Sequence, residues 1–302
     1  MKEKAKPVKD SKQKGKEENS GTKLWSWIKT IIGAIIVVTI INGLAVASFV
    51  VPTPSMERTV MTGDFLFVNK FIYGPSTPQV IPFFNIPLPF IHFPVFREPQ
   101  RGDVIVFIFP GNRDEIKSEE FQYYLKRCVA IAGDTLEVKN NHLFVNHIEQ
   151  PLAPNAHYDP DVAEMPSEKY ETFPYGKGYT RENYGPIRIP KKGDVLQLSM
   201  NNLHEWVIFI AREGHKLTSD GTNIFIDGSQ TSSYRVERDY CFGMGDNRDH
   251  SLDSRYWGFI PKENIVGTPV IVYWSWDTNL PIRQIIDKIA STRWSRIGTL
   301  IK

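Results

Sequence analysis

Hydrophobic and polar positions alternate with a period of two along most of the chain after residue 60. This alternation predicts β-strands over seven segments: 64–74, 102–111, 126–138, 142–150, 193–200, 223–228 and 269–276. Gly-Asp pairs precede or separate several of these strands, where turns are expected: 63–64, 102–103, 133–134 and 193–194. Residues 202–214 form the best candidate for a soluble helix. The pattern therefore predicts a mainly β fold of coiled sheets with a long insertion.

One segment departs from this alternation, because residues 30–51 are apolar and uncharged over 22 residues. At about 1.5 Å rise per residue, a helix of this length spans a hydrocarbon core of about 30 Å. We expect a retained transmembrane anchor, although small residues around 46–48 would also suit cleavage of a secretory signal. No second run of this length follows in the sequence, so the prediction is a single-pass protein.

The charge distribution orients this anchor. Residues 1–29 carry nine lysines against four acidic residues, with almost no apolar residue before Leu24. Such a segment cannot bury enough surface to offset its ordering entropy, so we expect a disordered basic tail. The positive-inside rule keeps the tail cytoplasmic and places the rest of the chain outside the cytoplasm. No aromatic residue is interleaved with the early lysines, so nucleic-acid binding is not expected.

Two stretches of the predicted soluble part are irregular. Residues 75–99 contain seven prolines and five phenylalanines, which predicts an extended loop that either packs over the β core or contacts lipid headgroups. Residues 151–192 also show little regularity. We therefore expect 151–240 to be an insertion or cap between a first core part, 52–150, and a second core part, 241–302.

The cysteines and histidines limit the chemistry. Cys128 and Cys241 are too few for a disulfide scaffold, and buried free thiols are favoured over pairing in an oxidising compartment. The seven histidines are scattered without the spacing of a zinc site, so we expect no metal and no cofactor.

Ser55 is the first candidate for chemistry. It lies in "VVPTPSMERTV", where Pro52 and Pro54 prevent a helix from continuing through it. A serine nucleophile needs a base, and only His250 among the histidines lies in a loop that could supply one. A lysine in an apolar site is the other option, because desolvation lowers its pKa.

Lys126 is the lysine that fits this requirement. Strand alternation in "YYLKRCVAIAGD" places it on one small, apolar face with Tyr124, Cys128 and Ala130. A solvent-facing lysine on an edge strand is the commoner explanation of such a pattern. Both interpretations remain open on the pattern alone.

The third candidate is "GMGDNRDHSLDSRYWGFIP", residues 243–261. It lacks the central glycine and closing glutamate of a calcium loop. Its mixed charges before a Tyr-Trp-Gly sequence favour a buried or half-buried ion-pair network, formed by Asp246, Arg248, Asp249, Asp253 and Arg255.

Together these stretches resemble bacterial type I signal peptidases. The segments "PTPSM", "RGDVIVF", "KRCVAIAGD" and "GDNRDHSLDSRYWGFIP" have the order and rough spacing of that family, and "RWSRIG" resembles its ending. The resemblance covers the anchor and most of the soluble chain outside 151–240. It implies a membrane-bound serine endopeptidase with a mainly antiparallel β fold, formed by a catalytic core of coiled sheets and an inserted cap, which removes signal peptides at Ala-x-Ala type sites.

The resemblance also implies roles for single residues. Ser55 would be the nucleophile, Lys126 the general base, and Thr53 would join the Ser55 N–H in an oxyanion hole. Ser251 would hydrogen-bond to and orient the lysine. The residues implied to hold the site together are Asp253 and Arg255, and those implied to wall the substrate pockets are Val51, Pro52, Met56 and Leu125.

Some positions differ from the common family pattern. Thr53 replaces a frequent serine, His250 replaces an asparagine, and Cys128 and Ala132 replace valine and proline. None of these differences removes a proposed catalytic group, so they affect the shape of the pocket more than the reaction.

The implied partners are secretory preproteins and membrane lipid. The implied location is the inner (plasma) membrane, with the catalytic domain on the extracytoplasmic side. Two alternatives remain: a dedicated Ser-Lys processing peptidase with one substrate, and a non-enzymatic membrane-tethered β scaffold that binds envelope proteins.

Overall fold

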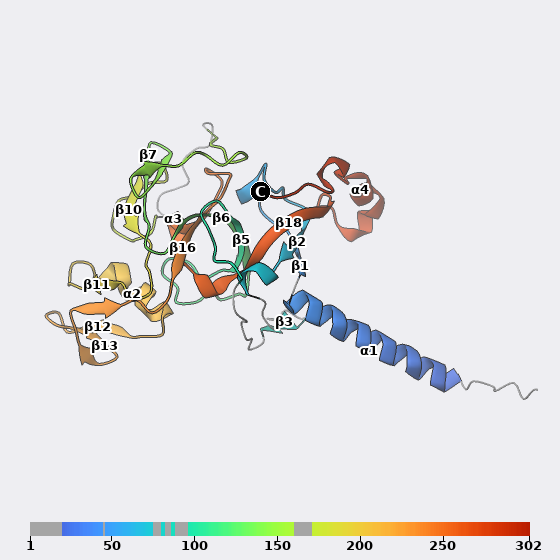
Figure 1. Ribbon diagram of the computed structural model, residues 1–302, viewed down its shortest axis with the longest axis horizontal. Helices are drawn as coiled ribbons and strands as arrows, with labels where there is room; N and C mark the ends of the chain where they lie inside the picture. Colours follow the sequence, from blue (N-terminus) through green and yellow to red (C-terminus); the bar gives the residue numbers. More distant parts are fainter. Residues whose placement is uncertain (1–19, 45, 75–79, 82–85, 88–95, 160–170) are drawn as a thin grey trace, which may run out of the picture.

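The computed structural model describes residues 20–44, 46–74, 80–81, 86–87, 96–159 and 171–302. Helix α1 (Ser20–Leu44) projects from one end of a mainly β body, as Figure 1 shows. The basic tail before residue 20 and most of the proline-rich segment 75–99 lie outside the described residues. Within 75–99, β3 (Val80–Ile81) pairs with β4 (Ile86–Pro87).

The predicted membrane helix ends earlier than expected. Strand β1 (Val46–Val50) follows α1 and pairs antiparallel with β2 (Asp64–Asn69) from Val46–Asn69 to Val50–Phe65. The end of the apolar run is therefore part of a sheet, because its β-branched and aromatic residues find a partner strand. Of the helices that the structure describes, none is both long enough and apolar enough to cross a membrane. The anchor stays a prediction.

The main sheet has seven antiparallel strands in the order β1-β2-β18-β5-β6-β16-β17. The long strand β18 pairs with β2 on one side and β5 on the other, with irregular register on both. Irregularities of this kind increase strand twist, which lets the sheet curl. The prediction of a mainly β, antiparallel fold is confirmed. The remaining bounds are β5 (Val104–Ile108), β6 (Tyr123–Ile131), β16 (Tyr240–Met244), β17 (Ile260–Pro261) and β18 (Ile265–Ser275).

A second sheet has the strand order β10-β7-β8-β9. The predicted strand 126–138 is two strands, β6 and β7, because the Gly133-Asp134 turn redirects the chain from one sheet into the other. Three of its strands precede residue 150, where we expected the first core part to end, and β10 follows it. One sheet therefore joins the expected core to the expected insertion. Its strands are β7 (Thr135–Lys139), β8 (His142–Val145), β9 (Ile148–Glu149) and β10 (Tyr184–Arg188).

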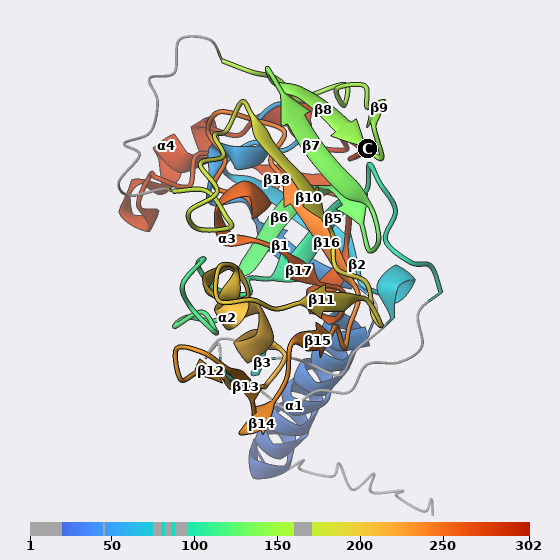
Figure 2. The ribbon, with the colours of Figure 1, turned by 90° about the vertical axis from the view of Figure 1, so that its left-hand side faces the viewer.

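The rest of the region expected to be an insertion contains short strands and α2 (Leu203–Arg212), which confirms the predicted helix. Phe209 and Ile210 of α2 are buried in the same apolar cluster as the second sheet, so α2 packs on that core. Figure 2 shows these elements below the second sheet. The short strands are β11 (Val195–Gln197), β12 (Leu217–Ser219), β13 (Ile224–Ile226), β14 (Ser229–Gln230) and β15 (Ser233–Arg235); α3 (Ser254–Trp257) and α4 (Ile285–Ala290) complete the helices.

Candidate active site

Ser55 lies in a short 3-10 turn, η1 (Pro54–Met56), that follows β1. The turn is attached to the loop after β16 through its carbonyl groups. The Asn247 backbone N–H donates to Ser55 O (3.2 Å), and the Asn247 side-chain amide donates to Pro54 O (3.2 Å). Ser55 is 8% exposed, so its hydroxyl lies in a largely desolvated position. Asn247, which lies 193 positions after Pro54, thus fixes the backbone of the serine turn.

Gly245 makes this close approach possible. A Cβ at this position would lie 2.5 Å from the Ser55 carbonyl oxygen and 2.2 Å from Ser251 Oγ. Real side chains do not tolerate contacts this short, so only glycine fits between the loop and the serine turn. Sequence reasoning missed this role, although the glycine stands at the start of "GDNRD".

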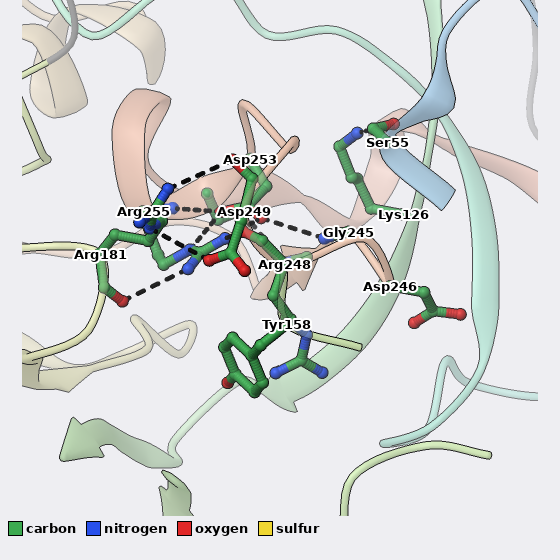
Figure 3. A network of polar contacts seen from close by, with 12 residues as sticks. Ser55, Lys126, Tyr158, Arg181, Gly245, Asp246, Arg248, Asp249, Asp253 and Arg255 are labelled. Atoms are coloured by element: carbon green, nitrogen blue, oxygen red, sulfur yellow. Dashed lines mark hydrogen bonds and ion pairs between the residues drawn. The ribbon is translucent and has the colours of Figure 1, made fainter. Parts of the chain in front are cut away.

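Lys126 meets Ser55 from β6. Its Nζ donates to Ser55 Oγ at 2.6 Å, and the two side chains face each other in Figure 3. Strand β6 lies inside the main sheet between β5 and β16, so the edge-strand interpretation is wrong. The lysine is 3% exposed, and its burial lowers its pKa to about 8, although the Asp253 charge partly opposes this effect.

The expected alternation along β6 fails beyond Cys128. The register shifts between the pairs Phe242–Ala130 and Gly243–Cys128, and this bulge changes which way the following side chains point. Cys128 packs with Cys241 and Ile105, whereas Ala130 joins the apolar cluster of the second sheet. Ala130 is therefore not on the Lys126 face as predicted. Both cysteines are buried free thiols.

Asp253 and Arg255 form an ion pair whose side chains are both 0% exposed. Arg255 Nε and Nη2 each donate to a separate Asp253 oxygen at 2.9 Å, and the Gly245 N–H donates to Asp253 Oδ2 at 3.0 Å. Burial alone would raise the pKa of Asp253, but Arg255, the Gly245 N–H and the Lys126 charge together lower it below its ordinary value. Through the hydrogen bond to Asp253, the ion pair thus fixes the backbone of Gly245, which lies against the Ser55 turn.

A second buried ion pair joins Arg127, the residue after Lys126, to Asp246. Arg127 Nε donates to Asp246 Oδ1 (2.8 Å) and Arg127 Nη2 to Oδ2 (2.6 Å), while Thr59 Oγ1 donates to the same carboxylate. The pair therefore joins β6, the residues after η1 and the loop after β16. The sequence signal for it was the arginine directly after Lys126.

The remaining residues expected at the site differ in their placement. Thr53 Oγ1 lies 3.4 Å from Ser55 Oγ on an exposed residue. Ser251 Oγ, expected to hydrogen-bond to Lys126, is buried and has no hydrogen-bond partner within the described part of the chain. Its Oγ lies 2.2 Å from the position that a Cβ of Gly245 would occupy, so the side chain packs against the glycine.

The expected pocket residues lie beside the serine turn. Val51, Met56 and Leu125 belong to one apolar cluster, and Pro52 is exposed. Met56 is 1% exposed and its sulfur accepts from the Asp246 N–H, so it lies deep in the site. Over the part of the chain that the structure covers, no three His, Cys, Asp or Glu side chains gather as a metal site.

Comparisons with known proteins agree on one family. Residues 24–274 match the model of the family described as signal peptidase, peptidase S26. The signal peptidase I of Helicobacter pylori is 30% identical over 266 residues, 83% of each chain. That of Aquifex aeolicus is 30% identical over 281 residues, 87% of this chain and 93% of the relative. A signal peptidase I structure from Enterococcus faecalis is 20% identical with a TM-score of 0.27, covering 57% of this chain and 97% of that one, so the family assignment rests on sequence.

Proposed function

Because the chain belongs to the signal peptidase family, peptidase S26, and is thus a serine endopeptidase, we propose that Ser55 is its nucleophile and Lys126 its general base. The observation that carries this proposal is the 2.6 Å contact between Lys126 Nζ and Ser55 Oγ in a buried site. A serine needs such a base, and a lysine with a pKa of about 8 is partly neutral near physiological pH.

The proposed reaction begins with neutral Lys126. Its Nζ lone pair accepts the Ser55 proton as Oγ attacks the scissile carbonyl, which gives a tetrahedral intermediate and a charged lysine. The lysine then donates this proton to the leaving amine. In the second half of the reaction, Lys126 activates a water molecule that hydrolyses the acyl-enzyme and restores the Ser55 hydroxyl.

The oxyanion is proposed to be stabilised by the Ser55 N–H and the Thr53 hydroxyl. What supports this role is that the Thr53 hydroxyl lies 3.4 Å from Ser55 Oγ, close to the atom that would attack the substrate carbonyl. Val51, Met56 and Leu125, which belong to one apolar cluster beside the serine turn, are proposed to wall pockets that admit only small side chains, as cleavage after Ala-x-Ala type sequences requires.

The proposed substrates are exported preproteins presented at a membrane. The apolar residues of α1 lead directly into β1, and the serine turn follows β1, so an anchor at this place would hold Ser55 close to the membrane surface. The lysine-rich start of the chain supports an orientation with the N-terminus in the cytoplasm and the catalytic part outside it, at the inner membrane.

Cleavage of a preprotein by the full chain in detergent tests the dyad. We expect Ser55→Ala and Lys126→Ala to lose cleavage, whereas Lys139→Ala, which removes an exposed lysine of β7, should keep it. Equal cleavage by all four proteins would contradict the proposal. Cleavage of a single preprotein from a varied panel would instead indicate a dedicated processing peptidase.

A further inference from the structure

Arg248 is a buried arginine that the proposed reaction does not use. It is 2% exposed, yet its Nε and Nη1 atoms have no hydrogen-bond partner in the described part of the structure. A buried charge without a partner is costly, because desolvation removes its hydration and nothing replaces it. We therefore expect the buried guanidinium of Arg248 to need an anion that balances its positive charge.

The nearby carboxylates are already paired with other arginines. Asp246 binds Arg127, Asp249 contacts Arg181 at 3.2 Å, and Asp253 binds Arg255. Within the described ranges, Arg248 forms no ion pair with an acidic side chain. The aspartates of the motif therefore do not supply the missing charge.

The side chain of Arg248 lines a pocket of about 370 Å³. The other walls come from residues 141–143 and 149–152 and from Tyr158, whose ring centroid lies 5.9 Å from the guanidinium carbon. Figure 3 shows Arg248 beside Tyr158 and pointing away from Ser55 and Lys126. The pocket is thus separate from the proposed catalytic site.

The polar groups of this pocket favour an anion. Glu149 is exposed to solvent, which screens its charge, and one of its oxygens lies 2.7 Å from His142 Nδ1. The ring of Tyr158 attracts the guanidinium face but cannot accept its in-plane N–H bonds. The side-chain oxygen of Asn141 is also buried without a partner among the residues described, and rotation of this amide would present its NH2 group instead.

We propose that this pocket binds a small oxyanion, a carboxylate or a phosphate, on the Arg248 guanidinium. The planar fork of an arginine matches two oxygens of either group, and burial strengthens these charge-assisted bonds. Arg248 directly follows Asn247, whose backbone N–H donates to the Ser55 carbonyl. Binding of an anion at Arg248 nevertheless requires neither the Ser55 nor the Lys126 side chain.

Isothermal titration calorimetry of the full chain in non-ionic detergent tests whether the pocket binds an anion. Phosphate and acetate are titrated separately at constant ionic strength, with chloride as the reference. We expect saturable binding of at least one anion to the wild type and to Ser55→Ala. Binding of phosphate alone assigns the phosphate class, binding of acetate alone the carboxylate class, and binding of both a general oxyanion site.

Substitution of the arginine completes the test. Arg248→Met should weaken binding about ten-fold or more, because it removes charge-assisted bonds, whereas Arg235→Met, which removes an exposed arginine of β15, should leave it unchanged. If Arg248→Met does not fold, Arg248→Lys replaces it in the test. This variant keeps the positive charge but loses the planar guanidinium, and its anion affinity should also fall below that of the wild type. Absence of saturable binding to the wild type, or equal affinity in the Arg248 variant, would overturn the proposal.

Discussion

Substitution of Gly245 by alanine should disrupt the dyad without touching either of its members. The new Cβ would lie 2.5 Å from Ser55 O, whereas ordinary contact begins at 3.4 Å, so the two atoms must separate by about 0.9 Å. The obstacle is backbone, and it cannot rotate away as a side-chain end would. The Ser55 turn and the 245–247 loop must therefore move apart.

This movement is large compared with the contacts that define the site. The Asn247 N–H to Ser55 O bond is 3.2 Å long and the Lys126 Nζ to Ser55 Oγ contact is 2.6 Å long. A misplacement of about 1 Å at reacting atoms costs about 100-fold in rate. We therefore expect Gly245→Ala to lower kcat/KM about 100-fold, and the forced packing to cost about 1–3 kcal/mol of stability.

The assay is kcat/KM for a fluorogenic peptide that carries a preprotein cleavage site. Gly33→Ala is the matched control, because a Cβ there meets no atom within 4 Å. Circular dichroism separates loss of activity from loss of fold. A folded Gly245→Ala protein with the kcat/KM of the wild type would refute the reasoning, since the serine turn would then tolerate displacement.

Substitutions at two other positions probe the base and the oxyanion hole. Lys126→Met should be inactive, yet at pH 7 its free energy of unfolding should exceed that of the wild type by up to about 3 kcal/mol. The reason is that the pKa of Lys126 is about 8 in the folded protein and 10.5 ordinarily, so folding disfavours the charged lysine. In urea unfolding, the difference should shrink as pH rises from 8 towards 10.5; a less stable Lys126→Met at pH 7 would contradict this. Thr53→Val should lower kcat about 100-fold, and Thr53→Ser should restore it if the hydroxyl stabilises the oxyanion; equal kcat in both would count against that role.

Much of the fold was predictable because strand alternation is a local property. The period of two identified β2, β5, β6 and β18 of the main sheet but not β1, β16 or β17. The Gly-Asp pairs lie at or before the starts of β2, β5, β7 and β11. The alternation failed at Ala130, because a bulge depends on the partner strand β16 rather than on the residues of β6. The predicted end of the apolar helix was wrong for a similar reason, since β1 is apolar like the helix before it but pairs with β2.

The site was only partly accessible from the sequence. The apolar neighbours of Lys126 left both burial and exposure open, and its contact with Ser55 joins residues 71 positions apart. The family resemblance, rather than any pattern, connected them. The requirement for glycine at 245 arises from the approach of a distant backbone carbonyl, and the resemblance implied a Ser251–Lys126 hydrogen bond that the structure does not have.

The pH dependence of kcat/KM tests the central claim, that a desolvated Lys126 activates Ser55, most directly. The substrate should be a peptide without groups that ionise between pH 6 and pH 11. Because only the neutral amine accepts the serine proton, kcat/KM should rise about ten-fold per pH unit below an apparent pKa near 8 and level off above it. A midpoint near the ordinary lysine value of 10.5, or a kcat/KM that does not rise between pH 6 and pH 8, would contradict the account.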